Sequence, residues 1–200
     1  MMKKRTSLMV TLAIISIGAS SAKALAQPMM PSLEDGRQLY ALARARKPVA
    51  PIFRSILPQL KRQSRIPILL PSELQVKPNP GQRFYVNSYP EANEYSLYIV
   101  YAPDCAGAVA CTDGWFHAER GGSLPDGDVR VRLAKGITGY YQPRSYKSPP
   151  AIDWVYQGVL YTISLKEEAG GYDRDAKSDA NKVKAWLIQV ANSAINAGAR

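Results

Sequence analysis

The stretch IDWVYQGVLYTISL, residues 152–165, decides the predicted fold. Two runs of aromatic and β-branched residues stand on either side of Gln157-Gly158, and a glycine between two such runs is typical of a tight β-hairpin turn. Downstream, after a polar link, the chain continues towards Gly198 with helical periodicity. Because a hairpin and a helix lying across it form two packed layers, the sequence predicts an α+β fold.

The C-terminal helix is predicted from seven apolar residues that recur at the spacing of one helix face. Three aspartates, Asp173, Asp175 and Asp179, stand towards its start, where the helix dipole favours acids. Gly198 stands where a helix-ending glycine belongs. We therefore expect the apolar face to pack on the hairpin. Its residues are Val183, Trp186, Leu187, Val190, Ala191, Ala194 and Ile195.

Further strands are predicted upstream of the hairpin, where the hydrophobic period changes from helical to alternating. The segment 66–70 is a short apolar strand, and Pro67 places it at a sheet edge or a strand start. The others are 82–89, 94–101, 115–119, 129–133 and 137–142. Together with the hairpin they predict a mostly antiparallel sheet of about seven strands, in a globular domain that covers residues 66–200.

Residues 1–26 are predicted to be a signal peptide. A basic start with Lys3, Lys4 and Arg5 precedes an apolar run at 8–19, which is short for a membrane span. Small residues in Ala24-Leu25-Ala26 form a cleavage site, and Ala22-Lys23-Ala24 is a second option. We expect an exported protein, periplasmic or extracellular, with no transmembrane span after cleavage. A retained N-terminal anchor is the alternative.

Once this leader is removed, the net positive charge of the chain is concentrated in residues 27–65. The whole chain carries +10, and the leader accounts for four of these charges, with Lys23 as the fourth. Residues 27–65 carry eight basic groups against two acids, whereas residues 66–200 are neutral, so the globular domain has no nucleic-acid signature. The basic groups are Arg37, Arg44, Arg46, Lys47, Arg54, Lys61, Arg62 and Arg65.

This basic N-terminal region, 27–65, is predicted to be helical but interrupted. A first helix begins near Ser32, and Pro48 and Pro51 end it. Ile52, Phe53, Ile56, Leu57 and Leu60 then repeat at helical spacing, with Pro58 as a kink or a restart. One interpretation is a packed helix with a solvated basic face. The alternative is that residues 37–65 contact anionic lipid head groups, acidic glycan or a partner.

Cys105 and Cys111 are the two cysteines of the chain, and we expect them to form a structural disulfide. A redox role would favour the spacing Cys-x-x-Cys at a helix start, which this pair does not have. The predicted bridge agrees with export to an oxidising compartment.

No catalytic, metal-binding or cofactor-binding motif is recognisable in the sequence. His117 is the one histidine, and no nucleophile-elbow pattern surrounds a serine, so His117 is interpreted as a half-exposed strand residue. Asp126-Gly127-Asp128 is a turn signal rather than a calcium loop. A pair of carboxylates that cleaves a glycosidic bond remains an alternative, because several acids are present. No feature of the sequence marks two of them as partners.

Aromatic residues gather in the second half of the chain. Trp115, Trp154 and Tyr161 are expected in the core. Tyr140, Tyr141, Arg144 and Tyr146 border the proline-rich loop 143–150, and we expect them to be exposed and to form the candidate ligand contact.

Three runs of the chain carry a resemblance: KGITGYY at 135–141, IDW at 152–154 with GVLYTI at 158–163, and VANSAI at 190–195. They resemble exported proteins of unknown function in cyanobacteria, over most of residues 65–200 and including the cysteine pair. The pattern Trp-x-x-x-Gly-x-x-Tyr-x-Ile before a terminal helix is also similar to small envelope domains that accompany bacterial lipoprotein-carrier and anti-sigma proteins. Neither resemblance implies a catalytic residue.

The expected function is a non-catalytic envelope or extracellular module that binds a polysaccharide, a peptide, a lipid or a partner protein. A carboxylate-dependent hydrolase of cell-wall or glycan material is one alternative. An assembly factor for another envelope protein is the other.

Overall fold

The computed structural model describes residues 47–76, 78, 80–105, 108–125, 129–145, 148–166 and 180–200. The predicted signal peptide, the predicted first helix up to residue 46, the turn at 126–128, Tyr146 and the three aspartates before the C-terminal helix lie outside the described residues.

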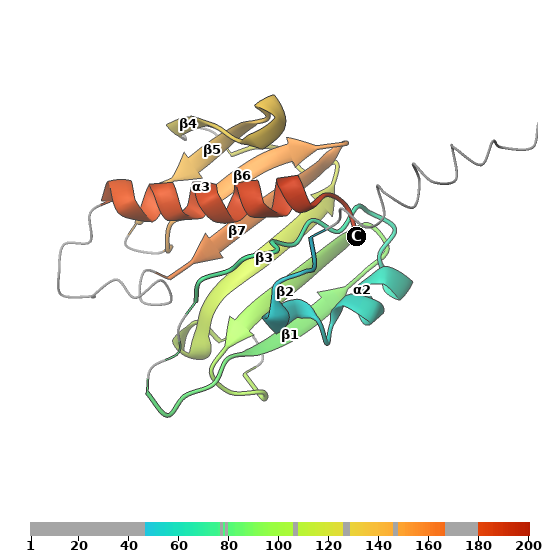
Figure 1. The fold of residues 1–200 in the computed structure, drawn as a ribbon, viewed down its shortest axis with the longest axis vertical. Coiled ribbons are helices and arrows are strands. Elements are labelled where there is room, and N and C mark those ends of the chain that lie inside the picture. The colour runs from blue at the N-terminus through green and yellow to red at the C-terminus, as the bar shows by residue number, and fades with distance from the viewer. Residues whose placement is uncertain are drawn as a thin grey trace, which may run out of the picture. The chain divides into compact units, whose positions relative to one another are not determined.

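Seven antiparallel strands form one sheet in the order β1-β2-β3-β7-β6-β5-β4 (Figure 1). The predicted α+β fold, with its antiparallel sheet of about seven strands, is therefore confirmed. The strands are β1 (Tyr85–Pro90), β2 (Glu94–Val100), β3 (Thr112–Arg120), β4 (Val129–Arg132), β5 (Thr138–Gln142), β6 (Ala151–Tyr156) and β7 (Val159–Leu165).

The hairpin predicted at 152–165 is the pair β6–β7. Its turn residues, Gln157 at φ 53° and Gly158 at φ 72°, both adopt positive φ, as a two-residue hairpin turn with the right-handed strand twist requires. Trp154 and Tyr161 lie opposite each other in the register, and their rings stack with centroids 5.4 Å apart. Both are buried, as predicted.

The C-terminal helix is α3 (Ala180–Ala197), which lies across β6 and β7 (Figure 1). All seven residues of the predicted apolar face are buried, so the predicted packing is confirmed. Gly198 ends the helix at φ 75°, and its N–H donates to the carbonyls of Ala194 and Ile195, both at 3.2 Å. This is the position where glycine relieves the steric cost of a left-handed residue.

The segment 66–70 is not a strand, contrary to the prediction. Its residues run as irregular chain over the helix-covered face of the sheet. The Ile68 carbonyl accepts from the Arg200 N–H at 3.1 Å, and tyrosine hydroxyls are further partners of the segment. Tyr161 donates to the Pro67 carbonyl at 2.7 Å. Tyr95 donates to the Leu69 carbonyl at 3.4 Å and accepts from the Leu69 N–H at 3.3 Å. Apolar composition predicted burial correctly, but Pro67 lacks an N–H and the sheet begins elsewhere.

Burial in this layer raises the pKa of both phenols. For Tyr95 the main cause is loss of solvation, reinforced by the neighbouring Tyr161, while the bond to the Leu69 backbone acts in the opposite direction. Loss of solvation is also the main cause for Tyr161, with Tyr156 reinforcing it and the positive charge of Arg120 opposing it. Both hydroxyls therefore stay protonated, as donors require.

Two short helices continue this layer beside α3: η1 (Pro51–Phe53) and α2 (Leu57–Gln63). Pro58 lies in the first turn of α2, which confirms the predicted restart. Phe53 and Leu60 are fully buried, and the Phe53 ring meets Phe116 edge to face at 5.0 Å. The second half of the basic N-terminal region therefore contributes to the same core as the sheet.

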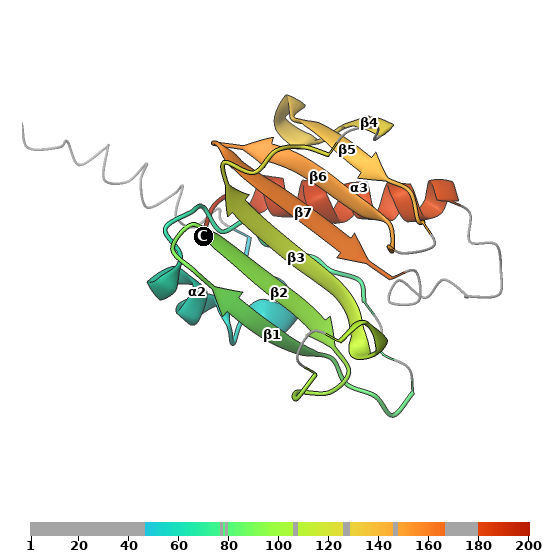
Figure 2. The same ribbon diagram turned by 180° about the vertical axis from the view of Figure 1, so that it is seen from behind.

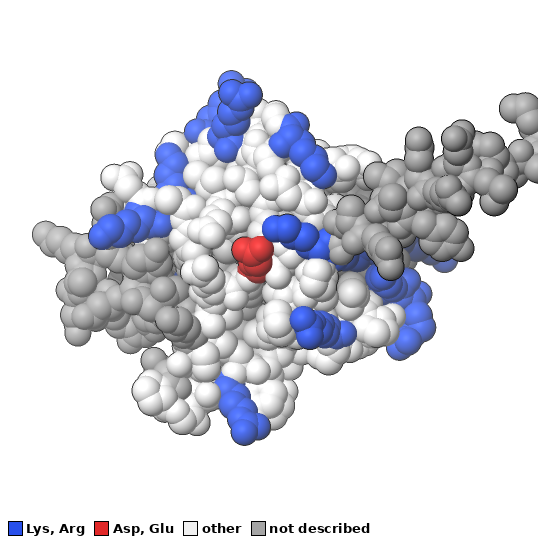
Figure 3. All heavy atoms as spheres, in the orientation of Figure 1, with Lys and Arg blue, Asp and Glu red and all other residues white. Residues whose placement is uncertain are grey.

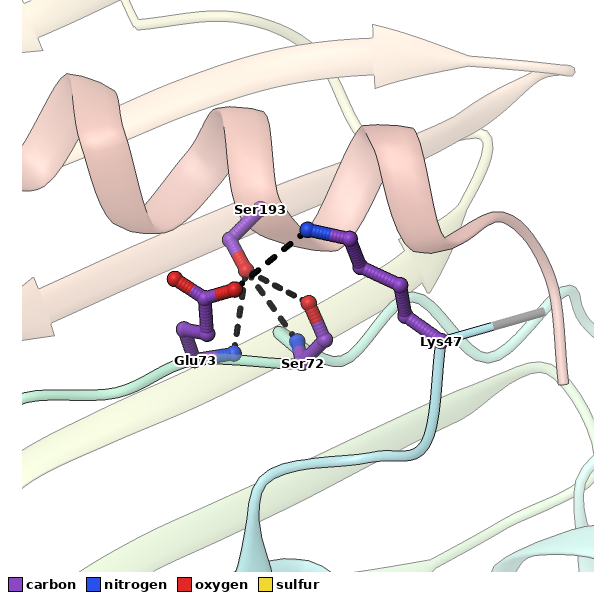
Figure 4. Close-up of polar contacts among 4 residues, drawn as sticks. All are labelled: Lys47, Ser72, Glu73 and Ser193. Carbon is purple, nitrogen blue, oxygen red and sulfur yellow. Dashed lines mark hydrogen bonds and ion pairs between the residues drawn. The ribbon is translucent and has the colours of Figure 1, made fainter. Parts of the chain in front are cut away.

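Polar side chains on α3 attach neighbouring segments to the helix. Ser193 Oγ accepts from the N–H groups of Ser72 and Glu73 and lies against Ser72 Oγ, each at 3.1 Å, and Lys47 pairs with Glu73 at 3.3 Å (Figure 4). One residue earlier, Asn192 Oδ1 accepts from the Ala134 N–H of η3 (Ala134–Gly136) at 2.6 Å. These bonds explain the polar pair within the run VANSAI as packing contacts.

Candidate functional site: the open face of the sheet

The two faces of the sheet differ in what covers them. α3, α2 and residues 66–70 lie on one side, whereas Figure 2 shows no described helix over the strands on the other side. We call this second side the open face. A central row of directly paired residues crosses it from one edge strand to the other: Tyr89, Ser96, His117, Thr162, Asp153, Tyr140 and Arg130.

Aromatic rings occupy one half of the open face. Tyr98 on β2 and Trp115 on β3 are direct cross-strand partners, and both are half-buried. Tyr89 meets Tyr98 edge to face at 5.7 Å and is 49% exposed, while Tyr85 is 40% exposed. Trp115 was predicted to be a core residue and instead lies on this face, because it alternates with Phe116, whose side chain takes the core position.

A disulfide-bridged loop borders the aromatic half. Cys105 and Cys111 lie at disulfide distance, with Cα atoms 6.1 Å apart, as predicted. Asn87, in the same row as Tyr98, donates from Nδ2 to the Cys105 carbonyl at 2.7 Å. The Asn87 bond attaches the loop to β1, beside the aromatic residues.

A buried carboxylate occupies the middle of the central row. Asp153 is 2% exposed, and its two oxygens accept from Thr162 Oγ1 and Gln142 Nε2, each at 2.5 Å. These donors lie on the strands to either side, β7 and β5. The carboxylate is thus occupied in joining three strands, which is the arrangement that a buried charge requires.

His117 forms the other polar contact of the central row. Its Nδ1 lies 3.0 Å from Ser96 Oγ, and its Nε2 lies 3.9 Å from Glu119 Oε2. The three residue types are those of a hydrolytic triad, but the second distance exceeds a hydrogen bond. The N–H groups around the pair serve the sheet, because β2 and β3 are each paired on both sides. That part of the sheet therefore supplies no backbone donor for an oxyanion.

The predicted contact residues separate between the two faces. Tyr140 is half-buried on the open face, opposite Asp153. Tyr141 is only 5% exposed and lies on the covered side, with Lys184 Nζ 5.8 Å from its ring centre, so its predicted exposure is wrong. Consecutive strand residues point to opposite faces, and this explains the separation. Arg144 is exposed as expected, and Tyr146 lies outside the described residues.

Sequence reasoning missed Tyr85, Tyr89, Tyr98, Ser96 and Asp153 as members of one surface. The signal for part of it was present, because Ser96 and Tyr98 alternate with Tyr95 and Leu97 along one strand. The missing information was which face α3 covers and that β3 pairs with the distant β7.

Among the described residues, no group of three or more His, Cys, Asp or Glu side chains is arranged to hold a metal ion. Within the same part of the chain, no helix has the length and apolar character needed to cross a membrane.

Comparison with family models, with curated proteins and with solved structures found no match to this chain.

Proposed function

We propose that this protein is an exported, non-catalytic binding module whose open face holds a glycan chain. The observation that carries the proposal is the aromatic pair Tyr98 and Trp115, which no described helix covers, beside the hydrogen-bonding side chains of Ser96, His117 and Thr162. Sugar rings have apolar C–H faces that pack on aromatic rings, and their hydroxyls form hydrogen bonds with polar side chains beside those rings. Aromatic side chains supply such contacts with little loss of conformational entropy.

The dimensions of the open face support an extended ligand. Tyr89 on β1 and Tyr140 on β5 stand five strand spacings apart in the sheet order, which corresponds to about 24 Å. Hydroxyl and imidazole groups of Ser96, His117 and Thr162 lie between them. A row of groups that crosses so many strands suits a chain of linked units better than a small compact molecule.

The polar contacts of this face favour binding over catalysis. Asp153 is held by two hydrogen bonds and is almost fully buried, so it does not face a second carboxylate across an open cleft. The Ser96–His117 pair is surrounded by paired backbone without a donor for an oxyanion. A hydrolase of glycan material is therefore the less supported alternative, as is an assembly factor.

Export is the second part of the proposal. The N-terminal pattern of residues 1–26 and the Cys105–Cys111 pair both support an oxidising compartment outside the cytoplasm.

The test is binding to a panel of neutral oligosaccharides, built from glucose and from N-acetylglucosamine, and to the corresponding insoluble polysaccharides. We expect saturable binding that Trp115→Ala and Tyr98→Ala each weaken by at least about fivefold, because each removes a stacking contact of about 1–3 kcal/mol by analogy with base stacking. The matched control is Val129→Ala, which removes an exposed apolar side chain from the covered side of the sheet.

Circular dichroism and a thermal melt of each variant show whether the fold is retained. Binding that both open-face variants leave unchanged would contradict the proposal. Release of new reducing ends by the wild-type protein, abolished in His117→Ala, would instead establish a hydrolase. Self-association that is lost in Trp115→Ala, without glycan binding, would assign the face to a protein contact.

A further inference from the structure

A basic pocket is lined by residues from the end of α2, from the β6–β7 turn and from positions 199–200. Figures 1 and 2 show α2 and the C-terminus at the same end of the sheet. The volume of the pocket is about 500 Å³. The walls are formed by the irregular segment 66–68, by Gln157 of the turn and by four basic residues: Lys61, Arg65, Arg120 and Arg200. No Asp or Glu is among the described residues that line it.

The charge of the pocket is not neutralised by its described neighbours. Lys61, Arg65 and Arg120 form no ion pair with any described carboxylate, since the ion pairs found are Lys47–Glu73 and His117–Glu119. Glu119 precedes Arg120 in the chain, but the two alternate along β3, so that Glu119 lies on the open face. Three like charges around one concave surface raise the local positive potential and attract an anion.

The pocket is built from fixed backbone as well as charge. Arg120 Nη2 donates to the Arg65 carbonyl at 3.5 Å, and the Arg65 N–H donates to the Ala92 carbonyl at 2.9 Å. The wall segment is held by Tyr161, which donates to the Pro67 carbonyl at 2.7 Å. Arg200 donates to the carbonyls of Lys47 and Leu70 and so shapes one side. The guanidinium of Arg65 and the other nitrogens of the Arg120 guanidinium can donate to a ligand.

The surrounding surface has the same sign. In Figure 3, the charged side chains drawn on the side that carries α3 and α2 are mostly Lys and Arg, spread over an otherwise uncharged surface with one acidic group near the middle. A ligand that approaches this side therefore meets a positive field before it reaches the pocket, and such steering increases association rates at low ionic strength.

We infer that this pocket binds a phosphate-bearing group through Lys61, Arg65 and Arg120. Arginine presents a planar fork of donors that matches phosphate oxygens in pairs, and lysine adds a point charge. The volume exceeds that of a single phosphate ion, so the phosphate belongs to a larger group, either a soluble phosphate ester or a phospholipid head group. This site is independent of the open face and of glycan binding.

The experiment uses three probes with the full protein: inorganic phosphate, glycerol 3-phosphate, and vesicles of phosphatidylglycerol compared with phosphatidylcholine. Binding is followed by titration calorimetry for the soluble probes and by sedimentation for the vesicles. The variants are Arg65→Gln and Arg120→Gln, each of which removes one guanidinium. The matched control is Arg132→Gln. It removes an exposed arginine on the edge strand β4 that points to the open face and does not line the pocket.

We expect saturable, salt-sensitive binding of glycerol 3-phosphate that each pocket variant weakens by at least about tenfold, because a hydrogen bond to a charged group contributes 1.5–3 kcal/mol. Arg132→Gln keeps wild-type affinity. Loss of vesicle binding in the same variants identifies a lipid head group as the source, while binding of the soluble ester alone identifies a soluble phosphate ester. Absence of saturable binding to all probes, or equal binding by wild type and both pocket variants, would overturn the inference.

Discussion

Two buried tyrosines make the stability of this protein sensitive to alkaline pH. Tyr95 and Tyr161 are 1% and 2% exposed, and their hydroxyls hold residues 67–69 against the sheet. Burial raises the pKa of both phenols above the ordinary value of 10.0. In the unfolded chain the same phenols lose their protons near pH 10. The native state therefore retains protons that the unfolded state has lost, and the free energy of unfolding falls as the pH rises above about 10.

The size of this effect follows from the unfolded-state pKa. At about pH 11, each phenol that stays protonated in the native state lowers the free energy of unfolding by at most about 1.4 kcal/mol. Tyr161→Phe removes one such phenol, so the free energy of unfolding of this variant falls less steeply between pH 9 and pH 11 than that of the wild type. At pH 7 the same variant is less stable by about 1–2 kcal/mol, because the Pro67 carbonyl loses its 2.7 Å donor. Tyr95→Phe costs less at pH 7, since its bonds to Leu69 are 3.3 and 3.4 Å long.

The assay is urea unfolding followed by far-UV circular dichroism at several pH values from 7 to 11. The control is Tyr89→Phe, which removes a half-exposed hydroxyl on the open face, away from residues 67–69, and is expected to keep wild-type stability at pH 7. A wild-type stability that stays constant up to pH 11 would refute the reasoning. So would an equal alkaline loss in wild type and in the double variant Tyr95→Phe/Tyr161→Phe.

Three further predictions concern the fold. Leu187→Ala removes a fully buried side chain from α3 and is expected to cost about 2–5 kcal/mol in urea unfolding, whereas Gln189→Ala, an exposed position on the same helix, stays near wild type; equal effects would contradict the packing of this helix. Gly158→Val places a β-branched residue at φ 72° in the hairpin turn and lowers stability by about 1 kcal/mol or more, a loss that should be absent if the turn lacks positive φ. Cys105→Ala/Cys111→Ala lowers stability by about 2 kcal/mol under oxidising conditions, and wild type measured with a reductant should then match it; an unaffected wild type would show that no bridge forms.

The local features of the fold could be predicted from the sequence. The β6–β7 hairpin follows from two β-rich runs around Gln157-Gly158, and α3 follows from seven apolar residues at helical spacing, because both patterns depend on neighbours close in the chain. The prediction failed at 66–70, where an apolar, β-branched composition reports burial but not ladder pairing. The partners there are hydroxyls of Tyr95 and Tyr161 and donors of Arg200, all of which are distant in sequence.

The candidate site could be predicted only in part. Alternation along 137–142 separates Tyr140 from Tyr141, so the separation of this pair between two faces was available from the strand period alone. The assembly of the open face was not available, since it requires β3 to pair with β7 while β4, β5 and β6 extend the sheet beyond it. Such long-range pairing is set by the packing of the whole sheet rather than by any local pattern.

Binding of a glycan by the open face is tested most directly by the indole N–H signals of the three tryptophans in a ¹⁵N-labelled sample. Trp115 lies on the open face, while Trp154 and Trp186 are buried on the covered side and serve as internal controls. Titration with the oligosaccharide that binds is expected to shift the Trp115 signal progressively and to leave the other two in place. A titration in which Trp115 does not move, or in which Trp154 or Trp186 moves instead, would contradict the proposed site.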